Sequence, residues 1–181
     1  MNKKEKKTPL SAGLCTLLSS LFAAIAVFLD QYTKILAAAH LKGKEAVSLI
    51  PGVLELKYLY PENRGIAFGM FQGSTAFFAV VSMILFALII WVFVKIPKKR
   101  YYIPLMAVCV LMLSGALGNM IDRVFRGYVI DFIYFSLIDF PVFNMADIYV
   151  VCGGILLVIL IFFKYKKDDD FDFLSFRKKE K

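Results

Sequence analysis

The chain has 181 residues, of which 60% are hydrophobic, with a mean hydropathy of +0.70 and a formal net charge of +8. This apolar content exceeds what the core of a soluble domain of this length buries, so the composition excludes an ordinary soluble fold. The positive charge lies outside the apolar stretches. We interpret it as a topology signal and an attraction to membrane lipids that are anionic, not as a nucleic-acid-binding surface.

Four apolar stretches are long enough, or nearly so, to cross a hydrocarbon layer about 30 Å thick. The sequence therefore predicts a membrane all-α fold, a four-transmembrane-helix bundle that forms a single integral membrane domain over residues 1–167. The predicted spans cover residues 10–29, 74–94, 101–120 and 143–163.

The distribution of basic residues predicts the orientation of these spans. Fifteen of the 22 Lys and Arg residues lie in the N-terminal segment, in the linker KIPKKR (95–100) and in the tail from Lys164. By the positive-inside rule, both termini and this linker face the cytoplasm, and residues 30–73 and 121–142 face outward. Residues 168–181 carry charges of both signs and are expected to form a cytoplasmic tail, either solvated or lying on the surface.

The first apolar stretch has some features of a cleavable signal peptide, because it follows a Lys-rich start and precedes the small residues AAAH (37–40). The polar motif DQYTK (30–34) interrupts the apolar run before those alanines. Loss of this span would also destroy the even topology. We therefore expect the first helix to be retained.

The two outward connections have different compositions. The first is rich in β-favouring residues over 38–70 and is punctuated by Pro51–Gly52, Pro61 and Gly65, so we expect a small extracytoplasmic β-sheet there. The second, 121–142, is amphipathic and rich in aromatic residues, which is typical of a segment at the membrane interface.

Neither a metal site nor another cofactor is indicated. Cys15, Cys109 and Cys152 all lie inside predicted spans and form no CxxC or Cys/His cluster, and His40 has no companion ligands nearby in the sequence. We expect the cysteines to be small core residues.

Five aspartates outside the tail lie at or near the outward ends of the spans, and three of them have simple structural interpretations. Asp30 stands four residues before Lys34, so the two charges share a helix face and form a structural pair. Asp122 has Arg126 four residues away and is also expected to be framework, close to a small face formed by Gly115 and Gly118. Asp139 is expected to be an exposed loop acid.

Asp131 and Asp147 differ because their sequence neighbours are apolar and no cation stands close beside them. An ionisable residue in such surroundings is a candidate functional group. Two carboxyl groups that lack cationic partners can share one proton if they meet, leaving one ionised and one protonated. Such a pair can hydrolyse an amide, because the carboxylate activates water while the acid protonates the carbonyl oxygen.

The motif order resembles that of signal peptidase II, the bacterial lipoprotein signal peptidase, over nearly the whole chain up to Lys167. Each motif is weak alone, but five in order on this topology are specific. They are DQYTK (30–34), NRGIAF (63–68), GNMIDR (118–123), VIDF (129–132) and FNMAD (143–147). Ile66 departs from the family, which commonly has Ala there, and we expect this change to alter packing without altering chemistry.

The resemblance implies an aspartic endopeptidase that removes the signal peptide of diacylglyceryl-modified prolipoproteins at the outer face of the bacterial cytoplasmic membrane. It implies a multi-pass monomer with both termini in the cytoplasm and no cofactor. Asp131 and Asp147 would be the catalytic pair. Four residues would support the site or the substrate: Asn63, Asn119, Arg123 and Asn144. Asp30 and Lys34 would be structural.

Three other interpretations remain open on the residues alone. Asn144 or Asp147 could simply cap the last helix, since an acid is favoured at a helix N-terminus, and capping is compatible with catalysis. A small proton-coupled transporter would use membrane acids as a relay, but the middles of the spans contain none. In a scaffold protein the acids would be dispensable.

Overall fold

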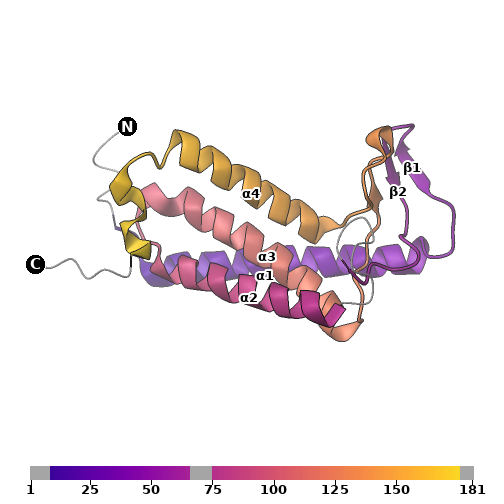
Figure 1. Ribbon diagram of the computed structural model, residues 1–181, viewed down its shortest axis with the longest axis horizontal. Coiled ribbons are helices and arrows are strands. Elements are labelled where there is room, and N and C mark those ends of the chain that lie inside the picture. Colours follow the sequence, from indigo (N-terminus) through magenta and orange to yellow (C-terminus); the bar gives the residue numbers. More distant parts are fainter. Residues whose placement is uncertain (1–8, 66–74, 176–181) are drawn as a thin grey trace, which may run out of the picture.

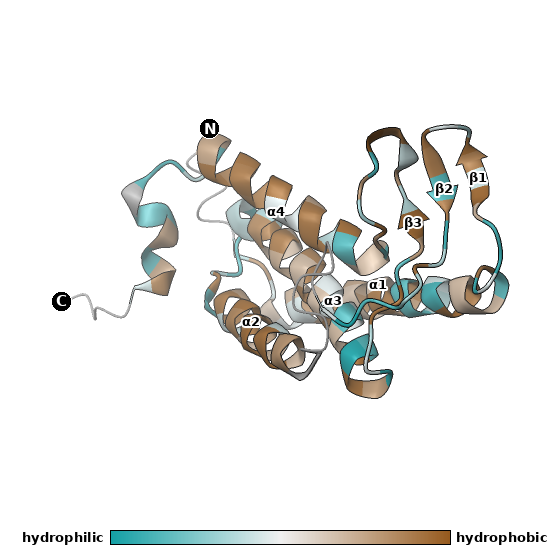
Figure 2. Cartoon of the chain, turned by 45° about the vertical axis from the view of Figure 1, so that its right-hand side comes forward, coloured by the Kyte–Doolittle hydropathy of each residue, from teal (hydrophilic) through white to brown (hydrophobic). Residues whose placement is uncertain are grey.

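Four long apolar helices run alongside one another in the computed structural model, which describes residues 9–65 and 75–175 (Figure 1). Each is long and apolar enough to cross a membrane, as the sequence predicts. Hydrophobic residues cover the helices along most of their length, whereas polar residues gather at their ends and in the loops that lead to the sheet (Figure 2). The helices are α1 (Ala12–His40), α2 (Thr75–Lys95), α3 (Ile103–Phe125) and α4 (Met145–Phe163).

Helix α3 is the centre of the bundle, since it packs against each of the other three and is the most buried of them. Its small residues allow this close packing. Gly115 lies against Ala146 and Val150 of α4, and Gly118 lies against Asp30 of α1 and Ala146. The small face predicted from these two glycines is therefore present, and it brings α1, α3 and α4 together near the first turn of α4.

Helix α1 is longer than the predicted first span, which was expected to end at residue 29. It continues to His40 because its next three turns remain packed. Asp30 and Lys34 are fully buried against other helices, and Ala37 belongs to a buried cluster with Tyr58 and Phe132. The first outward connection therefore begins after His40 and not after residue 29 as predicted.

A three-stranded antiparallel sheet lies beyond one end of the bundle (Figure 1). Its first two strands, β1 (Val47–Ile50) and β2 (Leu54–Leu56), come from the predicted β-rich connection and are joined by a turn in which Gly52 adopts a φ of +70°. The third strand, β3 (Ile133–Tyr134), comes from the connection between α3 and α4, where the sequence predicted only an interfacial segment. A single turn of 3₁₀-helix, η3 (Ser136–Ile138), follows it.

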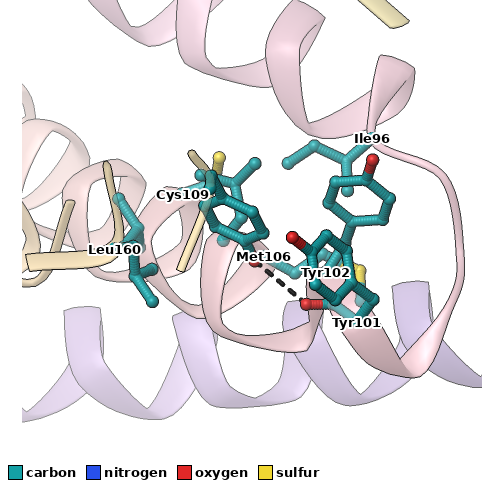
Figure 3. Close-up of a cluster of buried hydrophobic side chains, with 9 residues drawn as sticks. Ile96, Tyr101, Tyr102, Met106, Cys109 and Leu160 are labelled. Carbon is teal, nitrogen blue, oxygen red and sulfur yellow. Dashed lines mark hydrogen bonds between the residues drawn. The ribbon is translucent and has the colours of Figure 1, made fainter. Parts of the chain in front are cut away.

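The opposite end of the bundle holds an aromatic cluster. The short helix η2 (Arg100–Tyr102) places Tyr101 and Tyr102 beside Ile96 and Met106, as Figure 3 shows. The tail covers this cluster with another 3₁₀-helix, η4 (Asp168–Leu174).

The start of the tail is therefore part of the packed structure and not a solvated appendage. The carboxyl of Asp170 is fully buried and accepts a hydrogen bond of 3.1 Å from the Tyr101 hydroxyl, while its backbone carbonyl accepts one from Tyr102. Tyr165 also packs in this cluster and donates to the Tyr101 carbonyl at 3.0 Å. The boundary expected at Lys167 thus falls inside a folded segment.

Candidate active site

Asp131 lies in the connection just before β3 and is only 3% exposed. The backbone there is held by the sheet region, since the Asp131 carbonyl accepts from Leu59 N at 3.0 Å. Its two carboxyl oxygens accept from two amides: Asn63 Nδ2 donates to Oδ2 at 2.9 Å and Asn144 Nδ2 to Oδ1 at 2.6 Å. Burial first, and then the nearby charge of Asp147, raises the pKa of Asp131 from 3.8 to about 7.

Asp147 stands in the first turn of α4 and is partly exposed. Asn144 is the N-cap of this helix, and the two residues form a capping box. The Asn144 side chain accepts from Asp147 N at 3.1 Å, and Asn144 N donates to Asp147 Oδ2 at 3.1 Å. The capping role considered from the sequence is therefore real, and it fixes the position of Asp147 at the mouth of the helix.

Two asparagine side chains connect the acids to each other. Asn119 of α3 donates from Nδ2 to Asp147 Oδ1 at 2.8 Å, and its own Oδ1 accepts from Asn144 Nδ2 at 3.1 Å. Asn144 thus contacts Asp131, Asn119 and Asp147 at once. The sequence singled out these residues, but their bridging arrangement depends on three segments meeting and was not predicted.

A cavity of about 420 Å³ opens beside both acids. Asp131 and Asp147 line it together with Asn63, Asn119 and Arg123, so five of the six predicted site residues face one space. Most of the remaining wall is apolar, and the sequence reasoning did not identify it, because no motif distinguishes such residues from other apolar ones. This wall includes Val129, Phe140, Phe143, Ile148 and Val151.

The cations nearest to the site do not form ion pairs with the two acids. Within residues 9–65 and 75–175, neither Asp131 nor Asp147 has a cationic nitrogen within 4.0 Å. Arg123 lines the same cavity and donates to the Asn119 carbonyl at 3.4 Å, so its guanidinium remains close to any bound group. In the same described ranges no group of three or more His, Cys, Asp or Glu side chains is arranged to hold a metal ion.

A buried cluster of charged side chains contacts the residues that surround the candidate site. Lys34 Nζ lies 2.9 Å from Asp30 Oδ2 and 3.0 Å from Asp122 Oδ2, and all three side chains are fully buried. Arg126 pairs with Asp122. Both pairs follow the predicted four-residue spacing, but the sequence did not indicate that Lys34 joins the two acids. Ile66, which the sequence predicts to alter packing without altering chemistry, lies outside the described residues.

The cluster also anchors the backbone around the two site acids. Asp30 Oδ1 accepts from Ala146 N at 2.9 Å, beside Asp147, and Asp122 Oδ2 accepts from Ile130 N at 3.2 Å, beside Asp131. Both acids of the cluster therefore hold a residue adjacent to a site aspartate. This links the framework residues to the relative positions of the site acids.

The sequence is similar to a known family of proteins and to many of its members. The sequence model of the family described as Signal peptidase (SPase) II matches residues 22–163. A lipoprotein signal peptidase of Caldanaerobacter subterraneus is 44% identical over 142 residues, which cover 78% of this chain and 93% of that protein. One from Fusobacterium nucleatum is 39% identical over 144 residues, covering 79% of this chain and 86% of that protein.

Solved structures share the fold. A bacterial membrane enzyme structure at 2.3 Å resolution superposes with a TM-score of 0.76 at 31% identity and covers 90% of this chain and 96% of that one. A second, at 1.9 Å, gives a TM-score of 0.72 at 32% identity, with 87% and 97% covered.

Proposed function

The chain belongs to the signal peptidase II family, and on that premise we propose that it removes the signal peptide from diacylglyceryl-modified prolipoproteins, using Asp131 and Asp147 to activate water. The observation that carries this proposal is the meeting of the two acids on one cavity, bridged by neutral amides and free of ion pairs with the described cations. Such a pair can hold one proton and one negative charge at neutral pH.

The raised pKa of Asp131 suggests how the two roles divide. The deep burial of Asp131 raises its pKa to about 7, which favours a proton on that carboxyl. Asp147, which is more exposed, then acts as the carboxylate that takes a proton from the attacking water. Asp131 gives its proton to the scissile carbonyl oxygen as the tetrahedral diol forms. When the diol collapses, Asp147 gives the proton that it took from water to the leaving amine, and Asp131 takes a proton back from a diol hydroxyl, so the pair returns to its starting state.

The cavity suits a peptide that arrives from the membrane. Its apolar wall accepts aliphatic side chains and acyl chains, and the guanidinium of Arg123 can donate to a backbone carbonyl or a lipid ester. Because the site lies at the end of the bundle that carries the sheet, a substrate helix running beside the spans would present its end there. By the positive-inside rule this end faces outward and both termini lie in the cytoplasm. We also propose that the enzyme acts as a monomer.

The test compares wild type with Asp131→Asn and Asp147→Asn on a diacylglyceryl-modified prolipoprotein, scoring release of the signal peptide. Each variant should reduce kcat by at least about 1,000-fold, since each removes one partner of a concerted proton transfer. Asp139→Asn is the matched control, because Asp139 is an exposed loop acid that contacts Tyr134 and does not line the cavity.

We expect the Asp139→Asn control to cleave at the wild-type rate. Retained cleavage in either site variant would return that aspartate to a structural role, in which Asp147 serves only the capping box. No cleavage by the wild type would contradict the proposed substrate itself.

A further inference from the structure

We infer that Lys34 is a positioning residue of the active site: its ammonium group fixes the orientation of the Asn119 side chain, and thereby the hydrogen bond that Asn119 donates to Asp147. This inference rests on the proposed function, because it assigns a role toward the reacting acids. It concerns a residue that neither lines the cavity nor contacts either of the two acids.

The three contacts of Lys34 use its full hydrogen-bonding capacity. An ammonium group has three donors and no acceptor. Lys34 Nζ lies 2.9 Å from Asp30 Oδ2, 3.0 Å from Asp122 Oδ2 and 3.0 Å from Asn119 Oδ1, and its side chain is fully buried. Each donor therefore meets one oxygen, and no water is needed to complete the group.

This arrangement allows only one orientation of the Asn119 amide. If the amide were turned over, its NH₂ group would face the ammonium of Lys34, and two donors would meet in a buried place without an acceptor. Its oxygen would then face the Asp147 carboxylate, 2.8 Å away, where two acceptors repel. Lys34 thus selects the orientation in which Asn119 donates its hydrogen bond to Asp147.

The second contact to Asn119 Oδ1 is weaker. Asn144 Nδ2 also donates to that oxygen, at 3.1 Å, but it is a neutral donor that already serves Asp131 at 2.6 Å. A charge-assisted hydrogen bond is roughly twice as strong as a neutral one. Lys34 is therefore the stronger determinant of how Asn119 is oriented.

The charged and titratable groups around Lys34 and its partners come from three helices and one connection. They are Asp30 on α1, Asp122, Arg123 and Arg126 on α3, Tyr149, which lies near Asp30, on α4, and Asp131, whose pKa the charge of Lys34 lowers. Asp30 and Asp122 are matched by Lys34 and Arg126. A purely structural cluster could be replaced by any neutral, well-packed set without effect on the chemistry. A positioning residue could not.

The first experiment uses a charge-balanced variant, Asp30→Asn/Lys34→Met, with Asp30→Asn as its matched control. The double variant removes one charge of each sign, so the net charge of the cluster is unchanged, and methionine approximates the shape of lysine without its donors. Signal-peptide release is measured from about pH 5 to pH 9 in detergent, after monodispersity and thermal unfolding have shown that the variants fold.

We expect the double variant to lose about 10- to 100-fold in kcat with KM within about twofold of wild type. We also expect the acid limb of its pH–rate profile to move upward by about 0.5 to 1 pH unit, because the ionised pair loses a fixed donor. Asp30→Asn alone keeps Lys34 on Asn119 and adds net positive charge, so its acid limb should stay in place or move downward. An upward shift of equal size in both, or a wild-type profile in the double variant, would overturn the inference.

A second variant tests the inference even if the Lys34 variants do not fold. Asn119→Ala leaves Lys34 paired with Asp30 and Asp122, so the cluster persists. Its acid limb should rise like that of the double variant, and adding Lys34→Met to Asn119→Ala should produce no further shift. An unchanged profile in Asn119→Ala would rule out the route through Asn119. If the wild type cleaves but these shifts of the acid limb are not found, the inference about Lys34 fails while the proposed function stands.

Discussion

The approach of α4 to Gly115 sets the position of Asp147, and Gly115→Ala tests this directly. A methyl group at position 115 would collide with the carbonyl oxygen of Ala146, and it would lie 2.6 Å from Val150 Cγ2 and 3.2 Å from Val150 N. Two of these atoms belong to the α4 backbone and cannot rotate away. The helices must therefore separate, and the first turn of α4 must move.

The size of the effect follows from the missing space. Ordinary contacts of a Cβ begin near 3.4 Å, so the start of α4 has to shift by about 1 Å. Overpacking of this kind costs about 1–3 kcal/mol of folding free energy. Asp147 moves with α4, whereas Asp131 is held by the sheet region, and a misplacement of about 1 Å can cost about 100-fold in rate. We expect a corresponding fall in kcat.

The assay is signal-peptide release in detergent, together with thermal unfolding of the same samples. Gly154→Ala is the control, because it makes the same change on α4, at a position where an added Cβ meets nothing within 4 Å. We expect Gly154→Ala to match wild type in both measurements. If Gly115→Ala also keeps the wild-type kcat, the contact between α3 and α4 does not set the distance between the two acids, and the reasoning is refuted.

Two further predictions concern stability. Because burial raises the pKa of Asp131 from 3.8 to about 7, the folded protein binds a proton more tightly than the unfolded chain, so the stability present at low pH is lost as the pH rises from about 4 to about 7. Thermal unfolding measured at a series of pH values should show that the free energy of unfolding falls by at most about 1.4 kcal/mol per pH unit. Asp131→Asn should abolish this fall. A free energy of unfolding that rises over the same pH range would contradict the burial argument. At the other end of the bundle, Asp170→Ala should lower the free energy of unfolding by about 1–3 kcal/mol, because it removes a buried acceptor of the Tyr101 hydroxyl. Its kcat should remain at the wild-type value, and a lost kcat would show that the tail affects the distant site.

The features that the sequence predicted well are local ones. The four spans depend on length and hydropathy, and both the Asp30–Lys34 and Asp122–Arg126 pairs depend on a spacing of four residues along one helix. The small face at Gly115 is also a local feature. A glycine permits close packing of a helix whichever other helix lies against it.

The features that the sequence did not predict depend on contacts between segments that are far apart in the chain. Lys34 and Asn119 are 85 residues apart, and Glu55 of β2 is paired with Tyr134 of β3 across the whole of α2 and α3. The end of the first helix was placed too early for the same reason: a charge at residue 30 indicates the end of a span unless its buried partners are known. The sequence predicts a tail that is solvated or lies on the surface, because the tyrosine hydroxyls that donate to Asp170 lie 68 and 69 residues away in the chain.

Neutral amide groups donate hydrogen bonds to both Asp131 and Asp147. The side-chain oxygen of each of the three asparagines accepts a hydrogen bond from a group that can only donate. The donors are the Lys34 ammonium for Asn119, Asp147 N for Asn144 and Gly65 N for Asn63. All three amide nitrogens are thereby left to face carboxylates. A cation in direct contact would favour ionisation of both acids and remove the proton donor. Neutral amides stabilise a negative charge less than a cation would, so burial still favours a proton on Asp131. In the mechanism that we propose, Lys34 acts on Asp147 through Asn119 and contacts neither acid.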